Sequence, residues 1–354
     1  MRTLPIAVLA GDGIGPEVIA EGVRVLRSVE RLVPGDRFEL HEFSAGAGEF
    51  LRGGDPLPPE TLKQIGQCDA VLLGAMGLPD VRRANGVEMA PQLDLREHFD
   101  LYAGIRPIFL FHSDDSPLKA QQAGAIDFVI VRESTEGLFF ARKGSSSLAD
   151  PDARDVMRIS RHTSERLFRA AFRLAATRKK RVTLVDKANV LPSMAYFRGI
   201  FDEVAREFPD IAADRIYVDA AALYLIERPH SFDVIVTENM FGDILSDLAA
   251  GLVGGMGMAP SADIGDSFAV FQPSHGSAPS IAGRGIANPV ATILSVAMML
   301  DWFGTPDRAA LIQAAVRRVF CNREMRTAEM GGSLGTRAMG DAVIREMAQA
   351  TGNV

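Results

Sequence analysis

Two aspartates in the second half of the chain have the spacing of a carboxylate pair that could hold a metal ion. Asp243 and Asp247 are four residues apart within Phe241–Leu252, a stretch whose apolar spacing predicts a helix. Because residues four apart share one helix face, the two negative charges repel each other unless a cation lies between them. Carboxylate oxygens suit Mg²⁺ or Mn²⁺. Asp219, at the end of the predicted strand 216–218, could supply a third oxygen, although a solvated surface pair also explains the spacing.

One lysine is placed where a proton acceptor would be needed. Lys187 comes just after the predicted strand Val182–Val185, and the carboxyl ends of strands in an α/β sheet usually face the ligand crevice. A divalent cation nearby would lower the pKa of this lysine, as a catalytic base requires. The alternative is an ordinary surface lysine that pairs with Asp186.

Three arginines could together bind the carboxylates of a small acid. Arg96 and Arg106 are ten residues apart, and Arg132 directly follows the predicted buried strand Phe128–Val131. If the three converge, their guanidinium groups can clamp a di- or tricarboxylate through paired hydrogen bonds. Taken singly, each arginine is more typical of a surface ion pair.

Two loops of small residues could bring the backbone close to a ligand. The segment Gly11–Pro16 follows a predicted strand, but proline stands where the dinucleotide fingerprint of a Rossmann fold needs its last glycine. This segment therefore predicts a tight turn between a strand and a helix. The second loop, Pro273–Pro279, contains His275 among small residues, and a plain surface turn is its alternative.

These residues must be positioned by larger elements, and the pattern of the chain predicts an α/β sheet. Short apolar runs rich in β-branched residues predict strands, and stretches with helical spacing between them predict helices. Such alternation is typical of α/β architecture with largely parallel strands. The predicted strands are Pro5–Ala10, Ala70–Leu73, Phe128–Val131, Val182–Val185 and Val234–Val236, and the predicted helices are Pro16–Glu30, Ser164–Ala176, Ser193–Phe208, Phe241–Leu252 and, as a buried helix, Pro289–Leu300.

The composition limits the class of protein. With 354 residues the chain is long enough for two domains. Its 38 basic and 45 acidic residues give a net charge of −7, which argues against nucleic acid or an anionic membrane as a partner. Two cysteines, Cys68 and Cys321, cannot form a disulfide framework, and no apolar stretch is long enough to span a bilayer. We therefore expect a cytoplasmic protein.

Taken together and in order, these segments resemble the β-decarboxylating dehydrogenases, the isocitrate/isopropylmalate dehydrogenase family. The resemblance covers nearly the whole chain and is closest to the branch of the 3-isopropylmalate and tartrate/D-malate dehydrogenases. Its signatures are Gly11–Glu17, Val185–Val190, Asn239–Asp247 and His275–Pro279 with Gly285–Pro289.

The resemblance implies a fold of two α/β domains with a shared, largely parallel sheet, which is isopropylmalate dehydrogenase-like and not a Rossmann fold. Residues 1–100 plus 254–354 would form the first, cofactor-side domain. Residues 101–253 would form the second, which would make a homodimer. Lys187 and Asp219 would reach into the cleft of the partner subunit, so that each active site would be shared between two subunits.

The resemblance also implies a role for each candidate residue. Lys187 would take the proton of the substrate's 2-hydroxyl group, through water or Asp219, while hydride passes to NAD and CO₂ is then lost. The metal ion, Mg²⁺ or Mn²⁺, would bind at Asp219, Asp243 and Asp247. The substrate would contact Arg96, Arg106 and Arg132 through its carboxylates, and Gln92 and Leu93 through its C3 substituent. The cofactor would lie against His275, Gly276, Ser277, Ala278, Ser280 and Asn288.

Three positions depart from what this family usually carries. Phe139 stands at the place of the tyrosine that protonates C3, and phenylalanine has no proton to give. Ser280 stands where NAD-specific relatives usually carry aspartate, but it offers no cation for a 2′-phosphate, so NAD is favoured over NADP. Gln92 is polar where isopropylmalate enzymes carry leucine, so the C3 substituent is not fixed.

The sequence thus predicts an NAD- and metal-dependent dehydrogenase that oxidatively decarboxylates a (2R)-malate with a substituent at C3. The leading substrate is 3-isopropylmalate, which would place the chain in leucine biosynthesis. Tartrate or D-malate comes next, followed by homoisocitrate or isocitrate. Two non-enzymatic alternatives stay open, a regulatory subunit, favoured only by Phe139, and a nucleotide-binding module without chemistry.

Overall fold

The computed structural model describes residues 1–119, 121–146 and 149–352, which divide into two compact units. The first comprises Met1–Leu95, Gly254–Ala262 and the chain from Ser267 onward, and the second comprises Arg96–Val253 and Asp263–Asp266. Helix α4 (Pro91–His98) and strand β9 (Pro260–Ile264) contribute residues to both units.

The first unit is built on parallel strands. Strand β1 (Thr3–Leu9) pairs with β2 (Arg37–Glu42) and with β3 (Ala70–Leu73), and β10 (Ala269–Pro273) pairs with β3. The α9 helix is buried along nearly its whole length, as its apolar sequence predicts. The helices of this unit are α1 (Gly15–Leu32), α2 (Ala47–Gly53), α3 (Pro59–Ile65), α9 (Val290–Trp302), α10 (Pro306–Cys321) and α11 (Thr336–Ala350).

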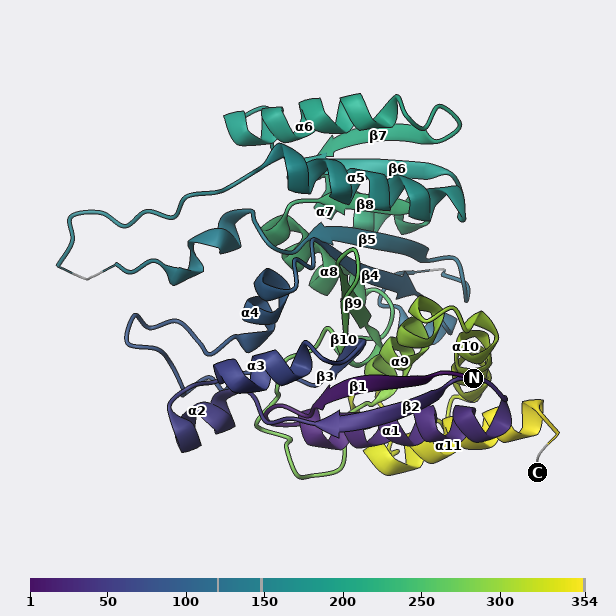
Figure 1. Cartoon of the computed structure of the whole chain (residues 1–354). Coiled ribbons are helices and arrows are strands. Elements are labelled where there is room, and N and C mark those ends of the chain that lie inside the picture. Colours follow the sequence, from purple (N-terminus) through teal and green to yellow (C-terminus); the bar gives the residue numbers. More distant parts are fainter. Residues whose placement is uncertain (120, 147–148, 353–354) are drawn as a thin grey trace. The chain divides into compact units, whose positions relative to one another are not determined.

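The second unit has a mixed sheet with helices on both faces (Figure 1). Strand β4 (Ala103–Phe109) runs antiparallel to β5 (Asp127–Glu133), and the following strands are parallel to β5. In sheet order these are β8 (Val234–Thr237), β6 (Arg181–Asp186) and β7 (Ala212–Tyr217). The helices are α5 (Arg161–Ala176), α6 (Pro192–Ala205), α7 (Val218–Glu227) and α8 (Asn239–Gly251). Short 3₁₀ helices in the two units lie at Ser113–Asp115, Leu138–Lys143, Pro229–Ser231, Met256–Met258 and Ala328–Met330.

The core of the second unit follows from the alternation of side chains along each strand. Val129 and Val131 pack with the buried phenylalanines of α5 and α6 on one face of the sheet. Phe128 and Ile130 point to the other face and pack with α7 and α8. Each such buried apolar side chain contributes about 1.5–3 kcal/mol.

This topology places several candidate residues at one edge of the sheet. Because β5, β6, β7 and β8 are parallel, their carboxyl ends lie at the same edge, where Arg132, Lys187, Asp219 and Asn239 occur. The α/β architecture with largely parallel strands is confirmed.

One predicted boundary is wrong. Strand β7 ends at Tyr217, so Asp219 lies in the first turn of α7 and not directly after a strand. Among the described residues, no helix combines the length and the apolar character that a bilayer crossing demands.

Candidate active site

Two of the predicted arginines lie on one face of the second unit's sheet. In the antiparallel pairing of β4 with β5, Arg132 lies opposite Gly104 and Arg106 lies opposite Ile130. Opposed residues share a face, and so do residues two apart along a strand, so the two arginines are diagonal neighbours. Ile130 packs with α7 and α8, so both arginines lie beneath these helices, and both are almost fully buried.

The guanidinium group of Arg132 is held by a neighbouring amide. Its Nε and Nη2 atoms donate hydrogen bonds of 3.0 and 2.6 Å to Oδ1 of Asn239, the first residue of α8. Its Nη1 atom donates to the carboxylate of Asp243, one turn further along the same helix. Three contacts therefore fix the plane of the guanidinium group.

The third arginine, Arg96, forms an ion pair with a buried carboxylate. The Nε atom of Arg96 on α4 lies 3.0 Å from Oδ2 of Asp263, whose side chain is fully buried. Burial alone would raise the pKa of Asp263, but the positive charges of Arg96, Arg106 and Arg132 outweigh burial and lower it. Burial lowers the pKa of Arg106 to about 10, an effect that Asp263 opposes and the other two arginines reinforce. Arg106 therefore remains cationic at neutral pH, and the charges of all three arginines act on Asp263.

The paired aspartates share one face of α8, as their spacing predicts. Burial raises the pKa of Asp247, and the negative charge of Asp243 raises it further. Asp243 is half-exposed and contacts Arg132, so the pair borders the arginine cluster. Two carboxylates whose charges oppose each other in this way suit a cation.

Lys187 and Asp219 form a pair of their own. The Nζ atom of Lys187 donates a hydrogen bond of 2.5 Å to Oδ1 of Asp219 and lies 5.9 Å from the centre of the Tyr217 ring. The alternative of a surface pair with Asp186 is wrong, because Asp186 accepts two hydrogen bonds of 2.7 Å from Arg198. Within the described parts of the chain, Asp219 does not join Asp243 and Asp247, and no three metal-ligating side chains gather into one group.

The residues expected to contact the substrate's C3 side lie on two short helices. Phe139, in the 3₁₀ helix Leu138–Lys143, has its ring centre 5.3 Å from the guanidinium carbon of Arg132. Gln92 and Leu93 lie in the first turn of α4, and Gln92 is one helical turn before Arg96. The side-chain oxygen Oε1 of Gln92 is buried and finds no hydrogen-bond partner among the residues that the structure describes.

The two small-residue loops meet in the first unit. The backbone N–H of Ile14 donates a hydrogen bond of 2.8 Å to the carbonyl of Ser277. Gly13 has a φ of +58°, and a Cβ atom there would collide with the same carbonyl. Only glycine therefore allows this contact between the turn after β1 and the loop after β10.

A cavity of about 540 Å³ opens beside this contact. Its lining includes Ile14, His275, Gly276, Ala278, Asn288 and Glu329. Within the described ranges of the chain, the Nε2 atom of His275 is buried without a hydrogen-bond partner. Burial lowers the pKa of this imidazole, so it is neutral at pH 7. The predicted Ser277 and Ser280 do not line the cavity; Ser277 is buried and uses its carbonyl to hold Ile14, whereas Ser280 is exposed.

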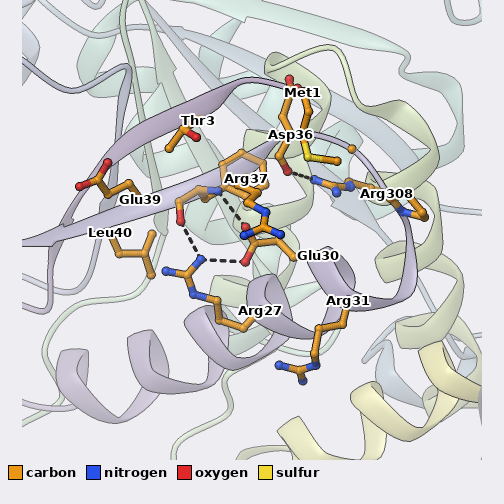
Figure 2. A pocket seen from close by; sticks show the side chains of 13 residues that line it. Met1, Thr3, Arg27, Glu30, Arg31, Asp36, Arg37, Glu39, Leu40 and Arg308 are labelled. Carbon is orange, nitrogen blue, oxygen red and sulfur yellow. Dashed lines mark hydrogen bonds and ion pairs between the residues drawn. The ribbon is translucent and has the colours of Figure 1, made fainter.

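Figure 2 shows a larger cavity of the first unit, about 970 Å³ in volume, between the end of α1 and strand β2. Arg27 there donates to Glu30 and to the carbonyl of Phe38, and Arg308 donates to the carbonyls of Val33 and Asp36. These contacts already occupy the side chains of Arg27, Glu30 and Arg308, and none of the residues predicted to be functional lines this cavity, so we place the candidate site elsewhere.

The buried carboxyl group of Glu133 lies beside Asn239, the residue that holds Arg132. Glu133 accepts hydrogen bonds of 2.6 and 2.8 Å from the N–H groups of Thr135 and Glu136. Asn239, which holds Arg132, directs its own amide nitrogen toward the carbonyl of Glu136 at 3.1 Å and toward Glu133 at 3.5 Å. Burial raises the pKa of Glu133 to about 7, the hydrogen bonds only partly opposing this effect.

We expect this shift to make the protein less stable as the pH rises from about 5 to 7. The pKa of Glu133 is about 7 when folded and near 4.5 when unfolded, so the folded chain binds one more proton in this range. The free energy of unfolding should therefore fall by about 1.4 kcal/mol per pH unit from this group. Denaturant unfolding at pH 5, 6 and 7 measures the slope.

Glu133→Gln should remove the contribution of this carboxyl group to the slope of the unfolding free energy against pH. The substitution can also change stability by an amount that does not depend on pH, and this leaves the slope unaffected. Glu203→Gln is the control, because the ion pair with Arg161 lowers the pKa of Glu203 and moves its titration below this range. An unchanged slope in Glu133→Gln would contradict the assignment.

Three functional candidates were not singled out by the sequence analysis: Asp263, Asn239 and Glu329. Asp263 lies in β9, and an aspartate within a buried strand is unusual enough to serve as a signal. Asn239 entered the sequence analysis only as the first residue of the signature Asn239–Asp247, and Glu329 gave no signal, since the partners of both come from distant parts of the sequence.

Comparisons with known proteins agree with one another. A family model described as isocitrate/isopropylmalate dehydrogenase matches residues 5–343. The 3-isopropylmalate dehydrogenase of Moorella thermoacetica is 47% identical over 97% of this chain and 98% of its own length. That of Bacillus subtilis is 45% identical over 90% of this chain and 89% of its own length.

Two solved structures that are similar to this chain carry names of the same family. The isocitrate dehydrogenase of Methylococcus capsulatus superposes with a TM-score of 0.88, at 37% identity, over 98% of this chain and 99% of that one. A β-decarboxylating dehydrogenase of Thermococcus kodakarensis superposes with a TM-score of 0.81, at 40% identity, over 99% and 97%.

Proposed function

The chain belongs to the isocitrate/isopropylmalate dehydrogenase family and is therefore an enzyme, and on that premise we propose that it oxidises and decarboxylates a (2R)-malate with a substituent at C3. 3-Isopropylmalate is the leading substrate. The observation that carries this proposal is the convergence of Arg96, Arg106 and Arg132 beside two carboxylates on α8. Three fixed cations suit the carboxylates of a small hydroxy acid.

A second candidate is a substrate of the tartrate type. No described residue donates a hydrogen bond to the buried oxygen of Gln92, which lies on the same helical face as Arg96. A hydroxyl group at C3 could donate a hydrogen bond to it, whereas an isopropyl group would leave it unsatisfied.

The donor set on α8 fits a divalent cation. Asp243 and Asp247 are one helical turn apart, and their mutual repulsion contributes to the raised pKa of Asp247. We expect Mg²⁺ or Mn²⁺ to bind here, with Asp219 of the partner subunit as a further ligand. Hard oxygen ligands of this kind are the ones these metals prefer.

The cavity around His275 fits the adenosine end of NAD. The unpartnered Nε2 atom of His275 offers a hydrogen bond to a ligand, and the space beside Gly276 is open. Asn288 and Glu329 add polar groups to the same lining. We expect NAD rather than NADP because Ser280 provides no positive charge for a 2′-phosphate.

The tasks of the chain's own residues follow from their positions. The arginines hold the substrate carboxylates, so the reacting carbon is presented in one orientation. Lys187 accepts the proton of the 2-hydroxyl group, and its bond to Asp219 offers this proton a way out. NAD held at the His275 cavity would supply a hydride acceptor for C2, and a cation held by Asp243 and Asp247 would supply the positive charge that polarises the hydroxyl group and stabilises the charge left by CO₂. Since Phe139 has no hydroxyl group, C3 is protonated by Lys187 or by water.

A homodimer would complete this site. Lys187 and Asp219 pair with each other and do not reach Asp243 or Asp247 within the described parts of the chain. The helices α7 and α8 contact each other and expose the apolar side chains of Leu223, Ile226 and Ile244, which suits a face that a second copy covers. We therefore expect each site to draw on two subunits, the first unit providing the cofactor side. The cytoplasmic location stays a prediction.

The test is NADH formation with Mg²⁺ or Mn²⁺ and a panel of substrates, with CO₂ trapped in parallel. We expect NADH and CO₂ in equal amounts from 3-isopropylmalate or, for the second candidate, from tartrate or D-malate. Isocitrate and homoisocitrate complete the panel. Equal efficiency with NADP would contradict the cofactor preference, and no turnover of any substrate would contradict the proposed function.

We expect Phe139→Tyr to increase kcat with decarboxylation, because a phenol in this position restores an acid of suitable reach for C3. General-acid catalysis contributes about 10²- to 10⁴-fold, so a gain near the lower end is expected when water already serves in part. Phe140→Tyr, at the exposed neighbouring position, is the control. No change in rate or in the ratio of CO₂ to NADH would show that protonation does not limit this enzyme.

A further inference from the structure

The cavity beside His275 has a wall that is built from a loop. This loop, residues 280–288, lies between β10 and α9 in the first unit. The residues of the loop that line the cavity are Ile281, Ile286, Ala287 and Asn288. The shape of the cavity therefore depends on where the 280–288 loop is held.

The middle of the 280–288 loop is exposed to solvent. Gly283, Arg284 and Gly285 are exposed, and the buried residues, Ala287 and Asn288, lie at the end of the loop. Glycine loses more conformational freedom on folding than any other residue. A loop with two exposed glycines therefore needs contacts from elsewhere to stay in one conformation.

Two side chains from distant helices hold the backbone of this loop. The carboxylate of Glu17 accepts hydrogen bonds from the N–H groups of Gly283 and Gly285, the second at 3.0 Å. An ionised acceptor makes such bonds stronger than neutral ones. Thr336, the first residue of α11, donates from its N–H to the carbonyl of Gly285 at 2.8 Å and from its hydroxyl to the carbonyl of Ala287 at 2.7 Å. Thr336 thus fixes the end of the loop, and Glu17 fixes its exposed middle.

Glu17 also connects the loop to another part of the cavity lining. It lies in the first turn of α1, three residues after Ile14, which lines the cavity. Because residues within one helical turn are held rigidly together, the bonds of Glu17 fix the loop relative to Ile14. A displacement of this wall by about 1 Å would be enough to weaken contacts with a ligand.

We propose that Glu17 is a positioning residue for the cofactor, whose carboxylate holds the 280–288 loop in the conformation that binds the adenosine end of NAD. This inference rests on the proposed function, which assigns the cavity around His275 to NAD. Without Glu17 the loop adopts other conformations as well. The apparent affinity then falls in proportion to the fraction of molecules whose loop is correctly placed.

Glu17→Ala tests the role of the carboxylate in binding. Titration with NADH, followed by its fluorescence, should give a Kd about tenfold above that of the wild type. The KM for NAD should rise by a similar factor, while kcat at saturating NAD stays within about twofold. Glu17→Gln keeps one acceptor oxygen and should give a Kd between those of the wild type and Glu17→Ala. An unchanged Kd in both variants would overturn the inference.

Amide hydrogen exchange shows whether the effect is confined to the loop. Without cofactor, the peptide that contains Gly283 and Gly285 should exchange faster in Glu17→Ala, and peptides of α9 should exchange at the wild-type rate. Glu60→Ala is the matched control, because Glu60 is also an acidic residue in the first turn of a helix, α3, in the same unit. Its loss removes a similar interaction with the helix dipole and should leave the Kd unchanged. An equal loss of affinity in Glu60→Ala would overturn the inference.

The binding measurements separate this inference from the proposed function. If the wild-type protein does not bind NADH, the cavity is not the cofactor site, and both fail. If the wild type and Glu17→Ala bind NADH equally well although the loop of the variant exchanges faster, the cofactor site stands, and only the role of Glu17 fails.

Discussion

Replacing Lys187 by methionine should lower kcat by about 10²- to 10⁴-fold, the usual contribution of a general base. Methionine keeps the length and apolar stem of lysine but cannot accept a proton. Because the arginines rather than Lys187 are proposed to hold the substrate carboxylates, KM should change much less than kcat. Steady-state kinetics with the accepted substrate, NAD and saturating Mg²⁺ give both quantities.

Lys179→Met is the matched control. Lys179 lies in the same unit and donates one hydrogen bond of 2.7 Å to the carbonyl of Asp127, at the start of β5. Asp127 is at the opposite end of β5 from the carboxyl end where the candidate residues lie. The loss of Lys179 should therefore leave kcat unchanged. A Lys187→Met enzyme with wild-type kcat would refute the assignment of the base.

Replacing Asp247 by asparagine should lower the affinity for Mn²⁺ by about 10²-fold or more, since one charged ligand is worth several kcal/mol. In the absence of divalent cations, the same change should leave the protein as stable as before, or more stable. The reason is that burial and Asp243 already raise the pKa of Asp247, so a neutral side chain suits this place.

Asp247→Asn should weaken metal binding without lowering the stability of the metal-free protein, so a general loss of folding cannot explain the expected result. Thermal unfolding with and without Mg²⁺ should show a rise in Tm for the wild type and none for Asp247→Asn, because a bound ion stabilises only the folded state that binds it. Asp214→Asn, which removes a surface pair with Arg181, should behave as the wild type. A normal metal-dependent rise in Asp247→Asn would exclude Asp247 as a ligand.

The two variants also test the sharing of sites between subunits. If Lys187 and Asp247 of one site come from different subunits, a mixed dimer of the two inactive variants contains one intact site. Random mixing should then restore about a quarter of the wild-type activity. No recovery in proven mixed dimers would place both residues in the same subunit's site.

The fold was largely predictable because its strands are short, β-branched and separated by amphipathic helices. The β-branched apolar runs Val182–Val185 and Val234–Val236 predict β6 and β8 directly. β4 was not predicted, because it contains Arg106 and Pro107, which are rare within a sheet interior. We propose that this arginine belongs to the site, and the negative charge of Asp263, distant in the sequence, favours its charged form.

The candidate site was predictable only in part, for a similar reason. The spacing of Asp243 and Asp247 on a helix is local information, and the structure places them as expected. The surroundings of Asp263 are not local, since Arg96, Arg106 and Ser134 come from three other elements. A buried charge is explained only by its neighbours, and those appear only when the chain is folded.

The hydrogen bonds between Asn239 and Arg132 affect the entropy of binding a small acid. A free arginine side chain has several rotatable bonds, and a ligand that immobilises it loses about 0.5–1.5 kcal/mol of conformational entropy. Nε and Nη2 of Arg132 are already fixed by one amide oxygen, so this loss occurs when the chain folds. Association with a small acid should therefore carry a smaller entropic penalty than the number of ordered contacts suggests. Replacing Asn239 by alanine would transfer that penalty from folding to binding.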